Sequence, residues 1–141
     1  MGQFAEFLGN HPLLSAVAFV IIVLLIQDVL GASINGIKNL NPVAATGLIN
    51  HEEAVVLDVR EASEFSTGHI LNAIHIPFSK LNDQLSKLEK HKDAHIIISC
   101  RTGARSGSAC KVLKKLGYEK LYNLQGGVVA WEGANLPLTK K

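Results

Sequence analysis

The residues with the clearest chemical potential form the run Cys100–Ser106, which reads Cys-Arg-Thr-Gly-Ala-Arg-Ser. It follows the apolar run 96–99, which predicts a buried strand, and precedes a helical pattern over 106–116. A cysteine between a strand and a helix N-terminus meets free N–H groups and the positive end of the helix dipole. With Arg101 and Arg105 beside it, we expect Cys100 to be a nucleophilic thiolate with a lowered pKa.

A second group of polar residues follows another predicted strand, 54–57, and consists of Asp58 and Arg60. We expect these two to pair with loop or backbone groups and so to support the site. Cys110, on the predicted helix after the loop, is interpreted as core packing, although a redox role for it stays open. His69 is expected to form a structural hydrogen bond near a turn.

Composition excludes several other classes of function. The chain has 141 residues, two cysteines, six histidines and a formal net charge of +2. It has no Cys-x-x-Cys and no Cys/His cluster, so we expect no metal, no other cofactor and no disulfide framework. It also lacks a basic cluster with interleaved aromatic residues, so we expect no nucleic-acid partner.

The hydrophobic pattern beyond residue 36 alternates between short strands and helices. This pattern predicts an α/β fold with a mainly parallel sheet flanked by helices on both faces. In such sheets ligands bind beyond the carboxyl ends of the strands, where Asp58 and Cys100 are placed. Strands are expected over 37–40, 54–57, 73–76, 96–99 and 121–124, and helices after Asn41-Pro42, around 63–66, across Leu81, Leu85 and Leu88, and over 106–116 and 128–133.

The first part of the chain carries the uncharged apolar run 13–26. We interpret residues 1–30 as an N-terminal membrane anchor with a transmembrane helix over about 12–30, residues 31–36 as a linker and residues 37–141 as one domain. A cleaved signal and a buried core helix are the alternatives. The basic domain and the reactive thiol favour a single-pass protein of the cell inner membrane whose domain faces the cytoplasm.

Three segments resemble the signatures of rhodanese domains, and together they cover about residues 37–138. The cysteine loop is the central one. Two departures lie outside that loop: Leu71-Asn72 stands where Pro-Gly is common, and His75 where Asn is common. The first segment comprises 55–60, Glu64-Phe65, 68–70 and 72–77, the second is 100–106, and the third comprises 126–128, Ala130-Trp131 and Leu136-Pro137. Together with the anchor, the chain resembles membrane-anchored single-domain rhodaneses of bacteria, which are thiosulfate sulfurtransferases.

The resemblance implies a sulfurtransferase in which Cys100 takes sulfane sulfur from a small donor such as thiosulfate or a persulfide. Cys100 holds that sulfur as a persulfide and passes it to a thiol or cyanide acceptor. The loop residues that would bind the substrate are Arg101, Thr102, Gly103, Ala104 and Arg105, with Asp58, Arg60 and Ser106 in support.

Related folds that act on phosphate or arsenate have five residues between cysteine and arginine, whereas four separate Cys100 from Arg105. The shorter loop favours a single sulfur atom over a tetrahedral oxyanion. The alternative in a different class is a membrane-anchored binding or scaffold module with little catalysis. The anchor also points to a membrane protein as a further partner. The sequence leaves the donor, the acceptor and the oligomeric state open.

Overall fold

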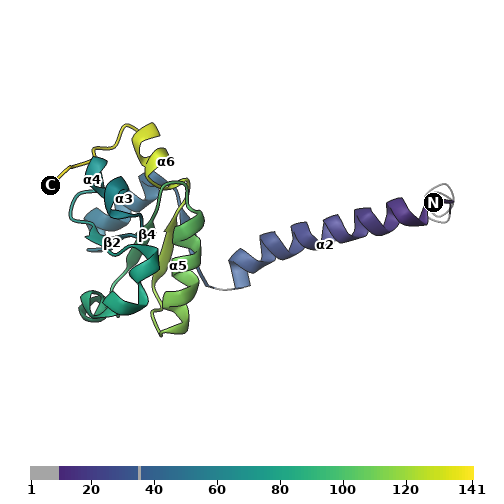
Figure 1. Ribbon diagram of the computed structural model, residues 1–141, viewed down its shortest axis with the longest axis horizontal. Coiled ribbons are helices and arrows are strands. Elements are labelled where there is room, and N and C mark those ends of the chain that lie inside the picture. The colour runs from purple at the N-terminus through teal and green to yellow at the C-terminus, as the bar shows by residue number, and fades with distance from the viewer. Residues whose placement is uncertain (1–9, 35) are drawn as a thin grey trace. The chain divides into compact units, whose positions relative to one another are not determined.

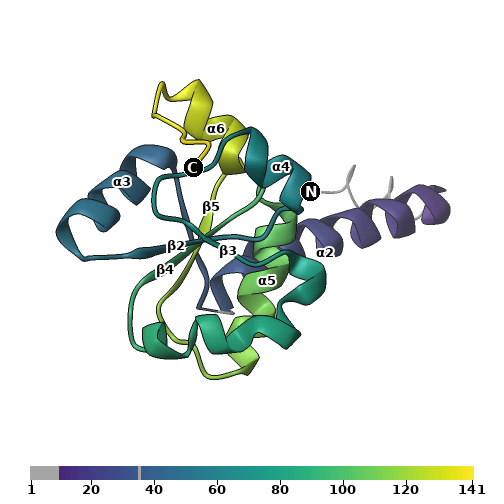
Figure 2. The ribbon, with the colours of Figure 1, turned by 60° about the vertical axis from the view of Figure 1, so that its left-hand side comes forward.

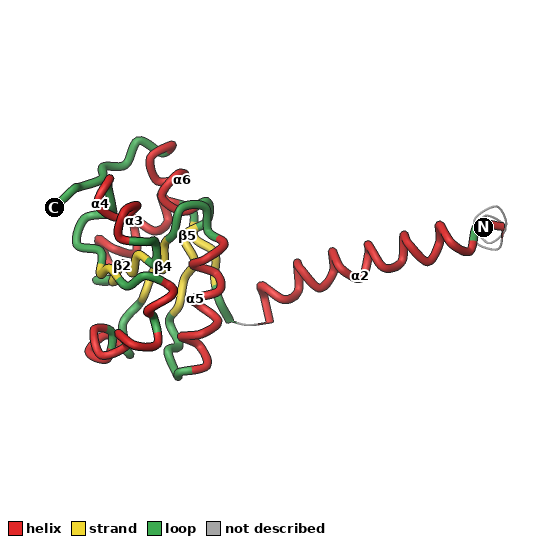
Figure 3. The backbone as a smooth tube through the Cα atoms, in the orientation of Figure 1, coloured by secondary structure: helices red, strands yellow, loops and turns green. Residues whose placement is uncertain are grey.

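The computed structural model describes residues 10–34 and 36–141, and the chain divides into two units between residues 35 and 36. The first unit contains the single described helix α2, Pro12–Ile34, which Figure 3 shows as one continuous helix. The predicted linker 31–36 is therefore helical as far as Ile34. Asn35 and the first nine residues of the predicted anchor lie outside the described residues.

Within the described residues, no helix combines the length and the apolar character needed to cross a membrane, so the predicted transmembrane helix is not supported. The uncharged apolar run 13–26 is fourteen residues long. A helix of that length rises about 21 Å, against a hydrocarbon core of about 30 Å.

The second unit is built on a five-stranded sheet whose strand pairs are all parallel, in the order β1-β5-β4-β2-β3. Figure 1 labels the main elements. The strands are β1 Lys38–Leu40, β2 Val55–Asp58, β3 Ile74–His75, β4 Ile96–Ser99 and β5 Leu121–Leu124. The helices are α3 Pro42–His51, α4 Ala62–Thr67, α5 Ala104–Lys115 and α6 Gly127–Gly133. The predicted fold class is confirmed for this unit.

Two hydrophobic clusters cover the two faces of the sheet, because successive residues of each strand point to opposite sides. On one face α5 packs against Leu57, Ile96 and Ile98. On the other face Ala45 of α3 and Trp131 of α6 pack with Ile97. Figure 2 shows α3 and α5 on opposite sides of the strands. Strand β4 is fully buried and β2 is buried except for Val55, so both strands begin with three apolar residues in a row.

The segment predicted as one amphipathic helix through Leu81, Leu85 and Leu88 forms three short 3-10 helices instead. They are η1 Phe78–Lys80, η2 Asn82–Lys87 and η3 Glu89–His91, and Gln84 has a non-helical backbone inside η2. Leu81 and Leu88 are still buried against the α5 face of the sheet. The spacing of three between Leu85 and Leu88 fits a 3-10 helix as well as an α-helix. The spacing of four between Leu81 and Leu85 spans the non-helical Gln84.

The carboxyl ends of β2 and β4 lie side by side, because Asp58 pairs with Ser99 in the parallel register. The backbone N–H of Val59 then donates to the carbonyl of Ser99 at 2.9 Å. Cys100 directly follows Ser99, the last residue of β4. Residues 58–60 and the cysteine loop therefore lie at one edge of the sheet, as the sequence predicts.

Candidate active site

The cysteine loop is a tight turn between β4 and α5. It comprises residues 100–103, because α5 begins at Ala104, two residues earlier than the sequence predicts. Gly103 makes the turn possible with φ +102°, a backbone conformation that residues with a side chain rarely adopt. The first turn of α5 is thereby brought directly against Cys100.

The sulfur of Cys100 is surrounded by hydrogen-bond donors. The N–H of Gly103 donates to Sγ at 3.0 Å, and the hydroxyl of Ser106 lies 3.3 Å from it. Burial favours the neutral thiol, but hydrogen bonds from the Ser106 side chain and from the N–H groups of Ser106, Gly103 and Thr102 outweigh it, so the pKa of Cys100 is lowered. The first turn of α5 adds the positive end of its dipole. The expected direction of the pKa shift therefore agrees with the geometry.

Cys100 is nevertheless buried, with 1% of its surface exposed.

The amino end of α6 holds the backbone of the loop in place. The N–H of Val128 donates to the carbonyl of Cys100 at 2.8 Å, and the N–H of Val129 donates to the carbonyl of Arg101 at 3.2 Å. In a trans peptide the C=O and the following N–H point in opposite directions. Fixing the Arg101 carbonyl on α6 therefore turns the N–H of Thr102 toward the sulfur.

This clamp requires a glycine at position 127. A Cβ there would collide with the carbonyl oxygen of Cys100 and would lie 2.5 Å from the carbonyl carbon of Arg101, and its φ is +59°. The sequence does not indicate this role of Gly127, which belongs there only to the third rhodanese-like segment, 126–128. Because α6 and the loop are far apart in the chain, no local signal marks their contact.

Asn123, on β5, is a second residue that sequence reasoning missed. The hydroxyl of Ser106 donates to its Oδ1 at 2.6 Å, while its Nδ2 donates to the carbonyl of Gly103 at 3.2 Å and to Oδ1 of Asn39 at 3.1 Å. Asn123 therefore contacts both ends of the α5 first turn. The signal available in the sequence was a polar residue in the middle of an otherwise apolar strand, Leu-Tyr-Asn-Leu.

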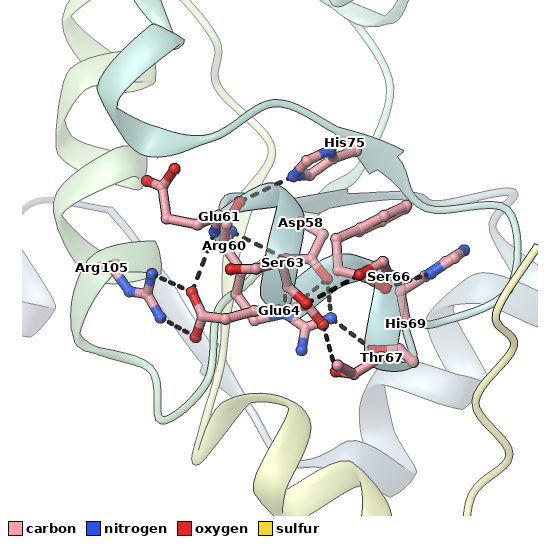
Figure 4. A network of polar contacts seen from close by, with 12 residues as sticks. Asp58, Arg60, Glu61, Ser63, Glu64, Ser66, Thr67, His69, His75 and Arg105 are labelled. Carbon is pink, nitrogen blue, oxygen red and sulfur yellow. Dashed lines mark hydrogen bonds and ion pairs between the residues drawn. The ribbon is translucent and has the colours of Figure 1, made fainter.

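Arg105 is placed differently from the expectation that it binds substrate. Its Nη1 and Nη2 donate to the two carboxylate oxygens of Glu64 at 2.8 and 2.7 Å (Figure 4). Both side chains are about one-third exposed. The Arg105 hydrogen bonds lower the pKa of Glu64 to about 2. The Arg105 guanidinium is thus already paired, and it ties α5 to α4 across the site.

Asp58 and Arg60 form a buried ion pair beside this contact, with Nη2 2.7 Å from Oδ2 (Figure 4). Nε of Arg60 donates to both carboxylate oxygens, and its Nη2 also donates to the carbonyl of Gly68 at 2.8 Å. The pair fixes the turn after β2 and joins it to the end of α4.

Arg101, the other arginine of the loop, forms no ion pair with the described residues. Together with Arg60 and Glu64 it lines a cavity of about 400 Å³ between α4 and α6. The other lining residues are Ser63, Thr67, Val128, Val129 and Glu132. Thr102 and Ala104 are exposed, and neither lines this cavity.

Two other candidates from the sequence have structural contacts. Cys110 is fully buried, and burial raises the pKa of its thiol to about 12, so it is inert at neutral pH. His69 is hydrogen-bonded through Nδ1 to the carbonyl of Phe65 at 2.9 Å and stacks on the Phe65 ring. Among the side chains that the structure describes, no group of three His, Cys, Asp or Glu could hold a metal ion.

Comparison with known proteins adds independent information. The rhodanese-like domain family model matches residues 42–134. The chain is 33% identical over 141 residues to the protein YibN of Escherichia coli, covering 99% of both chains. It is 35% identical over 91 residues to a protein named sulfurtransferase from Allochromatium vinosum, covering 64% of this chain and 83% of the relative.

A similar fold is found in the crystal structure of a rhodanese-related protein from Thermoplasma volcanium. The TM-score is 0.66 at 31% sequence identity, and the match covers 74% of this chain and 99% of that one. The match to the family model extends from α3 to the end of α6, so it includes the cysteine loop and the helix that clamps it. The chain therefore belongs to the rhodanese-like domain family.

Proposed function

We propose that this protein is a sulfurtransferase that carries sulfane sulfur as a persulfide on Cys100. One observation supports the proposal above all others: N–H groups of the loop and of the first turn of α5 converge on the sulfur and lower the pKa of Cys100. Such groups stabilise a thiolate, and they also stabilise the persulfide anion formed from it. The relative named sulfurtransferase supports the same class of reaction.

With thiosulfate as donor, the Cys100 thiolate attacks the outer, sulfane sulfur. A new S–S bond forms, the old S–S bond breaks, and sulfite leaves with the electron pair of the broken bond. The negative charge of the enzyme then lies on the outer sulfur of the persulfide. A thiolate acceptor attacks that sulfur in the second step, and Cys100 leaves as a thiolate again. No separate general base is needed for the ionised form of Cys100, and the lowered pKa enlarges the fraction of Cys100 in that form.

Arg101 is the residue proposed to attract the anionic donor. It lines the cavity beside the loop, which Glu64 and Glu132 also line, but unlike Arg105 it forms no ion pair with the described residues. Arg105 is proposed to act indirectly, by holding α4 against α5 through Glu64.

The test uses the full chain with thiosulfate, followed by mass spectrometry of the peptide that contains Cys100. The expected result is a mass increase of one sulfur atom on Cys100, its removal by cyanide or a thiol, and no increase in Cys100→Ser. The matched control Cys110→Ser keeps the modification. If Cys100 gains no sulfur and no thiocyanate forms, the sulfurtransferase proposal is wrong and the protein is a binding module with this fold.

We also propose that α2 attaches the protein to the inner membrane, with the domain in the cytoplasm. The large apolar side chains of α2 between Leu13 and Ile26 are all at least half exposed apart from Val23, and none of the residues in that run is charged. Lipid is the environment in which such a surface loses its contact with water. A reducing compartment would keep the Cys100 thiol free.

Two measurements test this placement. Alkaline extraction of membranes is expected to leave the full chain in the pellet, and its release into the supernatant would contradict attachment. Labelling of intact cells with an impermeant thiol reagent is expected to leave Cys100 unmodified while lysis exposes it, and labelling without lysis would contradict the cytoplasmic side.

A further inference from the structure

The hydroxyl of Ser106 lies between two groups that can each accept a hydrogen bond from its single proton. Asn123 Oδ1 is 2.6 Å from Ser106 Oγ on one side, and Cys100 Sγ is 3.3 Å away on the other. The orientation of the Asn123 amide is fixed by its other contacts. Its neighbour Gly103 offers a carbonyl oxygen, which can only accept, so Nδ2 faces Gly103 and Oδ1 faces Ser106.

Because Oδ1 can only accept, the Ser106 hydroxyl donates its hydrogen bond to Asn123 while Cys100 is a neutral thiol. Toward Cys100 the hydroxyl then presents a lone pair, which suits a neutral S–H donor. When Cys100 is a thiolate, Sγ can only accept, so it competes with Asn123 Oδ1 for the hydrogen bond that the Ser106 hydroxyl donates. Ser106 is itself fully buried, so no bulk water supplies a substitute partner.

We propose that Asn123 is a positioning residue that competes with Cys100 for the Ser106 proton. The hydroxyl donates to Sγ when the sulfur is a thiolate and returns to Asn123 when Sγ carries no charge. In the proposed reaction the second state is the persulfide, whose negative charge lies on the outer sulfur. Asn123 thereby accepts a hydrogen bond from the buried Ser106 hydroxyl after sulfur transfer. This hydrogen bond stabilises the persulfide form of Cys100.

Only this last step rests on the proposed sulfur transfer, because the competition itself is measurable without any sulfur donor. In Asn123→Leu the competing acceptor is absent, so the Ser106 hydroxyl can donate only to Sγ. The thiolate form of Cys100 is then stabilised relative to the thiol form. The expected shift is about one pKa unit downward, which corresponds to roughly tenfold more thiolate at a pH well below the pKa.

The experiment measures the rate of Cys100 alkylation by iodoacetamide against pH, in the full chain, with mass spectrometry of the Cys100 peptide. The pKa of Cys110 at about 12 keeps that thiol out of the titration range. Asn39→Ala is the matched control, because it removes a partner of Asn123 Nδ2 but leaves Oδ1 beside Ser106, and its pH profile is expected to match the wild type.

The decisive comparison is with the same substitution in a Ser106→Ala background. If Asn123 acts through the Ser106 proton, Asn123→Leu does not shift the alkylation pKa once the hydroxyl is absent. An equal shift in both backgrounds, an upward shift in the single variant or no shift at all would overturn the proposal. A purely structural effect of Asn123 on the loop would not depend on Ser106.

A second variant keeps the proposal testable if Asn123→Leu does not fold. Asn123→Asp also lacks Nδ2, so it loses the same bond to Gly103, but it retains an acceptor at Oδ1. The Ser106 hydroxyl therefore continues to donate its hydrogen bond to residue 123, and the pKa of Cys100 is expected to rise above that of the wild type. A fall in the pKa of this variant would refute the competition.

Discussion

Replacing Gly127 by alanine tests the clamp that α6 places on the cysteine loop. The added Cβ has no room, because backbone atoms of Cys100 and Arg101 occupy its position. Backbone atoms cannot turn aside as the end of a long side chain can. Either α6 or the loop must therefore shift, and the hydrogen bonds from Val128 and Val129 to the loop carbonyls lengthen or break.

The expected loss of stability has two sources. An L-residue in the left-handed region at φ +59° costs roughly 1–2 kcal/mol. Each hydrogen bond lost between α6 and the loop adds about 1 kcal/mol. We therefore expect Gly127→Ala to lower the free energy of unfolding by about 3 kcal/mol.

The same substitution is expected to raise the pKa of Cys100. When the Arg101 carbonyl leaves α6, the N–H of Thr102 is no longer directed at the sulfur. Loss of one or two N–H bonds to the thiolate raises the pKa by about one unit, so thiolate at neutral pH falls by up to roughly tenfold. Persulfide formation from thiosulfate slows by the same factor.

Urea denaturation gives the free energy of unfolding, and the pH profile of Cys100 alkylation gives the pKa. Gly47→Ala in α3 is the matched control, because nothing lies within 4 Å of its added Cβ and its φ is ordinary. This control is expected to stabilise the fold by about 0.5–1 kcal/mol and to leave the pKa unchanged. A Gly127→Ala protein with wild-type stability and a wild-type alkylation profile would show that α6 does not organise the loop.

Three further predictions follow from the ion pairs and the second cysteine. The Glu64–Arg105 pair stabilises the fold above pH 4.5 and loses that effect as the pH falls toward 2. We therefore expect Glu64→Gln to lower the free energy of unfolding by about 1 kcal/mol at pH 7. In urea titrations near pH 2 the difference between the variant and the wild type is expected to disappear. Asp58→Asn leaves the buried Arg60 guanidinium without its carboxylate and is expected to cost about 3 kcal/mol in the same assay, where a loss below about 1 kcal/mol would contradict the importance of the pair. Cys110→Ala keeps full sulfur loading of Cys100, as mass spectrometry can check, because the Cys110 thiol is buried and protonated; loss of loading in a folded variant would assign it a role.

Much of the fold could be predicted because its signals are local. The strands at 55–58, 96–99 and 121–124 are short apolar runs, and their alternation with helical patterns predicts parallel pairing. The leucines after Pro77 were predicted in the right environment but in the wrong helix type, since burial follows from spacing whereas 3-10 geometry does not. The apolar run near the amino terminus predicted a transmembrane helix that the described residues do not support.

The sequence by itself pointed to Cys100 as the candidate nucleophile, because a cysteine between a buried strand and a helix N-terminus lies close to free backbone N–H groups. It also determined that Asp58 would share an edge of the sheet with Cys100. Only the tertiary structure decided three contacts. Arg105 forms an ion pair with Glu64, Gly127 lets α6 pack against the loop, and Asn123 accepts a hydrogen bond from Ser106. Each of these contacts joins segments 17 to 41 residues apart, and nothing in a local pattern states which distant residue will fill a given position.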